Sequence, residues 1–315
     1  MRAPIFTGSG VAIVTPFRNE TVDLPALGHL IDLQLEAGTD AIIVCGTTGE
    51  ASTMTYRERM RTIEFCVEHV DGRVPVIAGS GSNATEVTVP LSRDAQHAGA
   101  DALLLVTPYY NKASQAGLIR HYQVVADAVD RPLILYNVPS RTGVSIAPET
   151  YVQLARHPNI VGVKEASGNL GNIQRTRALC PADFYIWSGN DDETVPLCAL
   201  GGVGVISVVA NIAPALMHRL TQLCLAGDYK AAGALQVELK ALCDAMFCEV
   251  NPIPVKTALE LMGMCGGTLR LPLCEPSEEH RERIRKTLVR YGLLDTEKWP
   301  PGIFRAAVSL RDILF

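Results

Sequence analysis

The sequence has little surplus charge of either sign. Its 315 residues carry 28 lysines and arginines against 33 aspartates and glutamates, a net charge of -5, and the basic residues form no cluster. Proteins that bind nucleic acid normally present a basic face or stripe to the phosphates. The charge pattern therefore argues against a nucleic-acid partner and favours a small molecule.

Patterns typical of metal sites, disulfides and membrane spans are also missing. The nine cysteines form no C-x-x-C pair, and the seven histidines show no H-E-x-x-H spacing. Scattered cysteines in odd number are typical of reduced core residues. No stretch approaches the length of about eighteen consecutive apolar residues that suggests a membrane span. We therefore expect a soluble, cytoplasmic protein with no metal and no membrane partner.

Short runs rich in Val, Ile and Leu recur along the chain. They are continuously apolar, as in parallel strands buried on both faces, and their starts lie 20 to 33 residues apart, which leaves room for a helix between them. Such βα units predict an α/β fold, a (β/α)8 TIM barrel. An open doubly wound sheet is the alternative, but no G-x-G-x-x-G turn follows the first run. The runs cover residues 11–17, 41–46, 74–80, 102–108, 133–139, 160–166, 184–190 and 204–210.

The remaining segments have helical periodicity. Between the runs we predict helices over 23–37, 55–69, 84–98 and 116–129, and after residue 210 we predict helices over 213–226, 229–249, 253–264 and 277–291. This pattern predicts a barrel domain over 1–226 that carries the active site and a small all-helical C-terminal domain over 227–294. Residues 295–315 form a tail of unknown role, which we expect to dock on its own subunit or to fray.

A lysine stands at the end of the sixth run, where barrel enzymes carry reacting groups. Lys164 follows the apolar residues 161–163. Burial lowers the pKa of a lysine and frees its amine to attack a carbonyl. The ordinary alternative is a lysine that reaches solvent or pairs with Glu165. Tyrosines at neighbouring strand ends favour a Schiff-base role for Lys164.

Hydroxyl groups at the neighbouring strand ends suit the proton transfers of imine formation. Tyr136 can act as acid and base, and Thr47 and Tyr110 can extend a relay, because hydroxyls both donate and accept. Arg141 can clamp a substrate carboxylate through two hydrogen bonds. The alternatives are an aromatic cap or subunit contact for Tyr109 and Tyr110, and an exposed loop position for Arg141.

Two other classes of function remain open at this point. The Asn-Asp-Asp-Glu stretch at 190–193 could hold Mg²⁺ for a metal-dependent enolisation. It lacks carboxylate partners at other strand ends, and Asn or Asp at a helix start is an ordinary N-cap. The second class is a catalytically silent barrel that binds an acid as a regulator.

Six motifs stand in this order along the chain: G-T-T-G-E at 46–50, T-P-Y-Y-N at 107–111, Y-N-V-P-S-R-T-G at 136–143, V-K-E-A-S-G at 163–168, G-V-I-S-V at 204–208 and N-P-I-P-V-K at 251–256. Together they resemble the dihydrodipicolinate synthase family, over residues 6 to 294. The resemblance implies condensation of pyruvate with L-aspartate 4-semialdehyde to 4-hydroxy-tetrahydrodipicolinate, the entry step of lysine and diaminopimelate synthesis, with no cofactor.

The resemblance also implies a role for each matched position. Tyr110 would reach into the site of a neighbouring subunit, which implies a homo-oligomer, a tight dimer commonly paired into a tetramer. The implied roles are imine formation for Lys164, a proton relay for Thr47, Tyr136 and Tyr110, binding of the pyruvate carboxylate for Thr48, binding of the semialdehyde carboxylate for Arg141, and a backbone lining for Gly189 and Ile206.

Sister enzymes of the superfamily share the lysine and the tyrosine but use other second substrates. They include N-acetylneuraminate lyase and keto-sugar-acid aldolases. The Thr47–Thr48 pair and the Ser-Arg-Thr-Gly stretch at 140–143 look like the synthase instead. The sister activity stays as the alternative, because specificity depends on loop contacts.

The feedback site of lysine-sensitive family members departs from the pattern in this chain. Those members carry histidines and a glutamate, whereas the matching positions here are Tyr56, Arg59 and Val87. Asn83 and Tyr109 are kept as possible allosteric residues. We therefore predict weak or absent inhibition by lysine.

Overall fold

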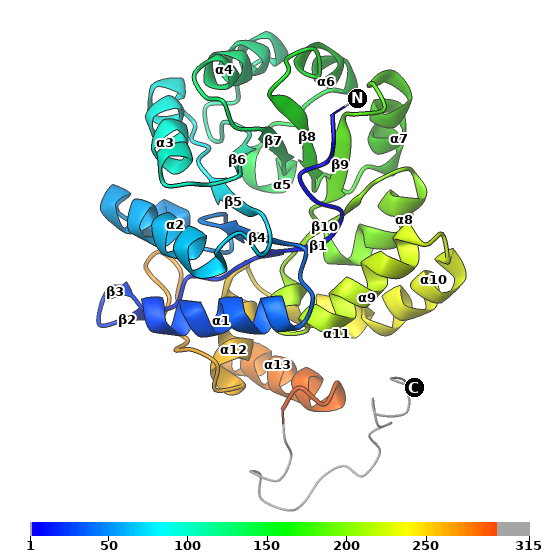
Figure 1. The fold of residues 1–315 in the computed structure, drawn as a ribbon. Coiled ribbons are helices and arrows are strands. Elements are labelled where there is room, and N and C mark those ends of the chain that lie inside the picture. The colour runs from blue at the N-terminus through cyan, green and yellow to red at the C-terminus, as the bar shows by residue number, and fades with distance from the viewer. Residues whose placement is uncertain (1, 295–315) are drawn as a thin grey trace, which may run out of the picture.

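The computed structural model describes residues 2–294, and across them eight parallel strands close into a barrel surrounded by helices (Figure 1). Neighbouring strands follow the order β1-β10-β9-β8-β7-β6-β5-β4, and β4 closes the ring by pairing with β1. The predicted (β/α)8 barrel is confirmed. The barrel strands are β1 Gly8–Ala12, β4 Ala41–Val44, β5 Val76–Gly79, β6 Ala102–Val106, β7 Leu133–Asn137, β8 Ile160–Glu165, β9 Tyr185–Ser188 and β10 Gly204–Ser207.

The first strand was predicted in the wrong place. It begins at Gly8 and not at Val11, because residues 8–10 are glycine and serine and give no apolar signal. Small residues are needed there, since a Cβ on Gly10 would lie 2.8 Å from the ring of Phe6. The apolar end of the predicted run, Phe17, instead begins a two-stranded hairpin of β2 (Phe17–Arg18) and β3 (Thr21–Val22).

Helices follow the strands and cover the outside of the barrel. The first four agree with the prediction to within two residues. Side-chain caps set the start of three of them, as with the reciprocal pair of Thr55 and Glu58 in α2, whereas the third begins after Ala84 without a side-chain cap. The outer helices are α1 Leu24–Glu36, α2 Tyr56–Val70, α3 Thr85–His97, α4 Gln115–Asp127, α6 Pro148–Leu154, α7 Leu170–Leu179, α8 Thr194–Ala199 and α9 Pro214–Leu225, with the short α5 Pro139–Thr142 after β7.

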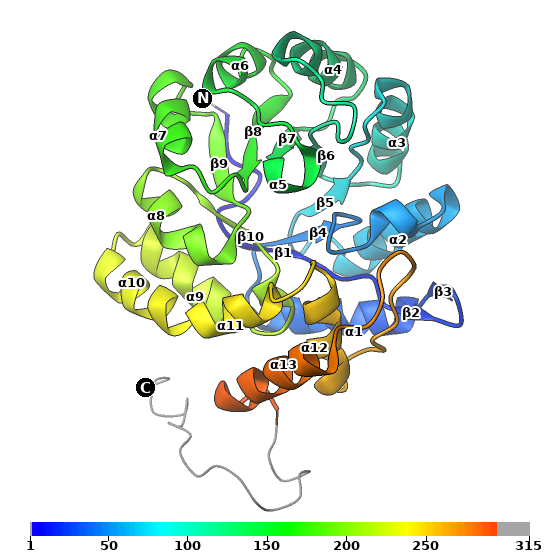
Figure 2. The same cartoon turned by 180° about the vertical axis from the view of Figure 1, so that it is seen from behind.

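After α9 the chain is helical, as predicted. One expected helix, 229–249, is two helices, because the chain turns at the buried Leu239. The division into two domains stays a prediction, and the 295–315 tail lies outside the described residues. Within residues 2–294 no helix is long and apolar enough to cross a membrane. The last helices, labelled in Figure 2, are α10 Tyr229–Glu238, α11 Lys240–Met246, α12 Ile253–Leu261 and α13 Glu278–Arg290.

The inside of the barrel forms its own apolar cluster. Val106, Tyr136, Lys164 and Trp187 are successive register partners across β6 to β9, so all four side chains point to the same side of the wall. The N-terminal segment crosses the barrel in Figure 1, and Phe6 stacks on Trp187 with ring centroids 5.4 Å apart. The N-terminal segment therefore packs into the inner apolar cluster.

Candidate active site

Lys164 lies in the barrel wall with 5% of its surface exposed. Burial lowers the pKa of its amine to about 8, the nearby Arg141 acts in the same direction, and Asp191 acts against them. Gly189 packs on its stem, since a Cβ there would lie 3.1 Å from Lys164 Cε. The result is a lysine that is partly neutral near physiological pH.

Tyr136 is the strand neighbour of Lys164. The Nζ atom of Lys164 lies 4.4 Å from the centroid of the Tyr136 ring. Burial raises the pKa of Tyr136, while Arg141 and a hydrogen bond with Thr47 lower it. The phenol is therefore protonated at neutral pH, and it can give a proton to a group bound beside the amine.

Glu165 is not the partner of Lys164. The two side chains alternate along β8, so they point to opposite faces of the barrel wall. The Glu165 carboxylate accepts hydrogen bonds from Asn137 Nδ2 at 2.9 Å and from the Tyr151 hydroxyl at 3.1 Å. Because Asn137 follows Tyr136, this buried contact also fixes β7 against β8 beside Lys164 and Tyr136.

The turn after β4 carries Thr47 and Thr48. Its backbone is held by the Thr15 hydroxyl, which donates to Gly49 O at 2.7 Å. Glu50 ends the turn with a positive φ of 53°, and its carboxylate forms a fully buried ion pair with Lys256 at 2.6 Å. The turn is thus anchored to α12, and Thr48 is 2% exposed.

Arg141 lies in α5 and is connected through Asn251 to Thr48 in the turn after β4. Its Nη2 atom donates to the backbone oxygen of Asn251 at 3.2 Å, and the Asn251 side chain donates to Thr48 Oγ1 at 3.0 Å. Reasoning from the sequence gave Asn251 no role. The only signal was its place at the start of the 251–256 motif.

A cavity of about 250 Å³ opens among these elements, and the Lys164 amine is not part of its lining. The residues around it come from the turn after β4, the ends of β5, β6 and β7, and helices α2 and α5. Ile206, in β10, is fully buried in the inner cluster of the barrel. The cavity lining includes Thr47, Tyr136, Arg141, Thr142, Arg59 and Tyr109.

Tyr110 is the one relay candidate that the described chain does not bring to Lys164. It has a positive φ of 73° and is 90% exposed. Its neighbour Asn111 donates from its side chain to the backbone oxygen of Asn83 at 2.8 Å, which joins the two loops.

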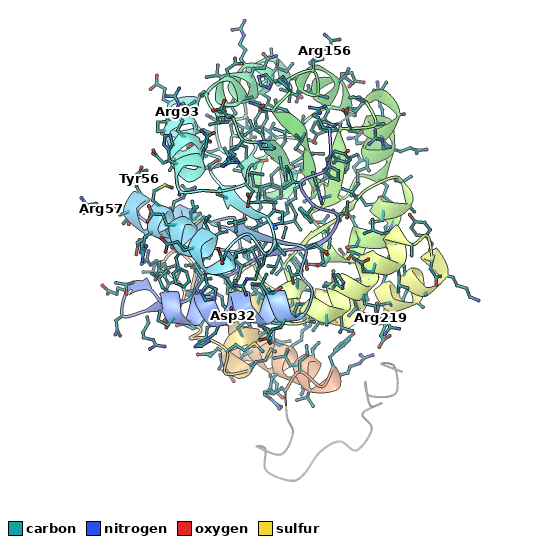
Figure 3. The ribbon with its side chains drawn as sticks, viewed as in Figure 1. Asp32, Tyr56, Arg57, Arg93, Arg156 and Arg219 are labelled. Carbon is teal, nitrogen blue, oxygen red and sulfur yellow. The ribbon has the colours of Figure 1, made fainter. Side chains whose placement is uncertain are left out.

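The residues at the expected regulatory positions are spread over α2 and α3. Tyr56 is 53% exposed at the outer rim, where its hydroxyl donates to Asp94 at 2.6 Å (Figure 3). Val87 is 49% exposed. Arg59 is turned inward and donates to Gly79 O at 2.8 Å. Of these three, only Arg59 borders the cavity.

Two of the three carboxylates of 190–193 already accept hydrogen bonds from the protein, and the third, Asp192, is exposed. Asp191 accepts from the Ser207 hydroxyl and from the backbone N–H groups of Val208 and Val209, and Glu193 accepts from Asn190. In the described part of the chain no three His, Cys, Asp or Glu side chains gather where they could hold a metal ion. The geometry gives no support to the magnesium alternative.

Comparison with known proteins gives consistent matches. A family model described as "Dihydrodipicolinate synthetase family" matches residues 5–290. The 4-hydroxy-tetrahydrodipicolinate synthase of Thermoanaerobacter sp. (strain X514) is 54% identical over 292 residues, which cover 92% of this chain and 98% of that protein.

Solved structures of relatives agree with the fold. A chloride-inhibited dihydrodipicolinate synthase from Acinetobacter baumannii, complexed with pyruvate, has a TM-score of 0.90 at 43% identity, covering 91% of this chain and 99% of that one. The enzyme from Cyanidioschyzon merolae, solved with lysine bound, has a TM-score of 0.89 at 38% identity, with coverage of 92% and 99%. The chain therefore belongs to the dihydrodipicolinate synthetase family.

Proposed function

We propose that the chain is a 4-hydroxy-tetrahydrodipicolinate synthase, which condenses pyruvate with L-aspartate 4-semialdehyde through a Schiff base on Lys164. One observation carries the proposal. A buried lysine, whose pKa is lowered to about 8, lies 4.4 Å from the ring of a buried tyrosine at the ends of adjacent barrel strands. A nucleophilic amine and a proton donor in this arrangement suit imine chemistry on a keto acid.

In the first half of the reaction the neutral Lys164 amine attacks the keto carbon of pyruvate. The carbinolamine then loses its hydroxyl as water, and Tyr136, in contact with Thr47, supplies the proton for this step. The iminium withdraws electrons from the adjacent methyl group, which loses a proton to give an enamine. The buried wall around Lys164 excludes bulk water from these steps.

In the second half the enamine carbon attacks the aldehyde carbon of the semialdehyde. The resulting alkoxide takes a proton from the relay. The amino group of the second substrate then attacks the iminium carbon, closes the ring and releases Lys164 as a free amine. The relay therefore both gives and takes protons, which suits hydroxyl groups.

The two substrate carboxylates require separate binding groups. We assign the pyruvate carboxylate to Thr48 and the semialdehyde carboxylate to Arg141, with Gly189 and Ile206 as the backbone lining. A guanidinium binds a carboxylate through two parallel hydrogen bonds, and a hydroxyl with a free proton binds one oxygen. The contacts of Thr48 and Arg141 with Asn251 support a shared region for both acids.

We further propose a cytoplasmic homo-oligomer, a dimer of dimers in which Tyr110 completes the relay of a neighbouring subunit. Tyr110 is 90% exposed on a single chain. A residue that passes protons to a buried substrate must be shielded from bulk water, and a neighbouring subunit would provide that shield. Sedimentation of the wild-type protein and of Tyr110→Phe, each with a pyruvate trapping assay, tests the proposal. A fully active monomer would refute it.

The second substrate decides between the synthase and its sisters. Pyruvate is offered with either L-aspartate 4-semialdehyde or N-acetylmannosamine, and consumption of each is followed with and without EDTA. We expect consumption of the semialdehyde alone, unaffected by EDTA. Consumption of N-acetylmannosamine would indicate the neuraminate lyase activity, and loss of activity with EDTA would revive the metal-dependent alternative.

A further inference from the structure

Asn251 joins the C-terminal helices to the two residues that the proposed function assigns to substrate acids. It lies between α11 and α12 and is 6% exposed. Its Nδ2 atom donates to Thr48 Oγ1 at 3.0 Å, and its backbone oxygen accepts from Arg141 Nη2 at 3.2 Å. One residue thus contacts both candidate carboxylate binders, through two different groups.

The contact with Thr48 determines which way the hydroxyl proton can point. A threonine hydroxyl has one proton to donate and two lone pairs that accept. Because Asn251 donates into one lone pair, the Thr48 proton is not used in this contact and remains available to a bound carboxylate. An acceptor at the same place would take the proton and turn it away from the substrate.

A second observation argues that Asn251 is more than packing. Its Oδ1 atom is buried and has no hydrogen-bond partner among the described residues. An unpaired buried amide oxygen is unfavourable, and an apolar side chain of similar size would avoid it. The amide is explained if its N–H group is required at Thr48.

We propose that Asn251 is a positioning residue for acid binding, in which the side-chain amide orients the Thr48 hydroxyl toward the pyruvate carboxylate and the backbone oxygen holds Arg141 for the second acid. The inference rests on the proposed function. It makes a selective prediction, because a side-chain substitution removes the contact with Thr48 and leaves the backbone contact with Arg141 in place.

The test is a double-mutant cycle on steady-state kinetics with both substrates varied. We expect Asn251→Ala to raise the KM for pyruvate about tenfold or more. Without the amide, the hydrogen bond from Thr48 to the charged pyruvate carboxylate weakens, and loss of such a bond changes affinity by about that factor. The KM for the semialdehyde should change less than about twofold, as expected for an unbroken backbone contact. Thr48→Val should raise the pyruvate KM to a similar extent, and adding Asn251→Ala to it should cause no further rise.

Controls separate this role from a merely structural one. Val250→Ala changes the exposed neighbour of Asn251 and should leave both KM values unchanged. Asn251→Leu keeps the size and removes the donor without adding charge, so it should reproduce the pyruvate defect, and it replaces the alanine variant if that variant does not fold. Equal rises in both KM values, or effects of Asn251→Ala and Thr48→Val that add fully, would overturn the inference.

Failure of the inference can be told apart from failure of the proposed function. Borohydride trapping of pyruvate on the wild-type protein reports the proposed function alone. A wild-type protein that traps pyruvate, together with an Asn251→Ala variant of unchanged pyruvate dependence, would refute only the positioning role. A wild-type protein that traps no pyruvate would refute the proposed function itself.

Discussion

Lys164 and Tyr136 are direct register partners on β8 and β7, and the Lys164 amine lies 4.4 Å from the centroid of the tyrosine ring. Their relation is set by strand pairing and by the buried contact of Asn137 with Glu165 on the next register pair. Both groups therefore stand on rigid elements, as the proposed roles of nucleophile and proton donor require.

The pH dependence of imine formation follows from the pKa of Lys164, which burial lowers to about 8. The neutral amine is the nucleophile, so the trapping rate should rise with pH and level off above about 8. Arg141 lowers this pKa, so Arg141→Gln should move the midpoint upward. Arg156→Gln, at the outer rim in Figure 3, is the control. A rate that keeps rising through pH 10 would contradict the lowered pKa.

Removal of the Tyr136 hydroxyl should slow catalysis without unfolding the barrel. Tyr136→Phe keeps the ring beside Lys164, and we expect kcat to fall about 100-fold or more, the usual range for loss of a general acid or base. Tyr122→Phe is a matched control, because the Tyr122 hydroxyl is buried and has no partner among the described residues. Its kcat should equal that of the wild type. Equal kcat values for the two variants would argue against the relay.

The buried pair of Glu50 and Lys256 should matter for stability as a unit. Both side chains are fully buried, so Lys256→Met leaves an uncompensated carboxylate and should lower the free energy of unfolding by about 3–5 kcal/mol. Adding Glu50→Gln removes that charge and should restore part of the loss. Denaturant unfolding measures both changes. Additive losses in the double variant would show that the two side chains do not act together.

L-Lysine should bind weakly or not at all, and its inhibition should be weak or absent. At the expected regulatory positions Arg59 places a positive guanidinium beside the cavity, which repels the lysine ammonium, and Val87 offers no carboxylate to pair with it. Calorimetric titration and a steady-state assay test this, with the Cyanidioschyzon merolae protein, whose structure has lysine bound, as the binding control. Strong inhibition at low lysine concentration would refute the prediction.

Much of the fold could be predicted from the sequence because parallel barrel strands are buried on both faces and read as continuous apolar runs. The first strand was misplaced because its start consists of Gly8, Ser9 and Gly10, which give no apolar signal, although the small size of Gly10 is needed against Phe6. The break at Leu239 was missed because both helices beside it share one apolar pattern.

Part of the candidate site could also be predicted, since Lys164 and Tyr136 end apolar strands and such ends meet at one face of a barrel. Asn251 could not be predicted this way. Its contact with Thr48 joins residues 203 positions apart and depends on how α12 packs on the turn after β4. Periodicity and strand ends carry no information on such a contact.

The most direct test of the account is reduction with borohydride in the presence of pyruvate, followed by mass analysis of the peptides. We expect one stable pyruvate adduct on Lys164 in the wild-type protein and in Lys230→Ala, an exposed control, and none in Lys164→Ala. An adduct on another residue, or trapping of pyruvate by Lys164→Ala, would contradict the central claim that Lys164 forms the Schiff base.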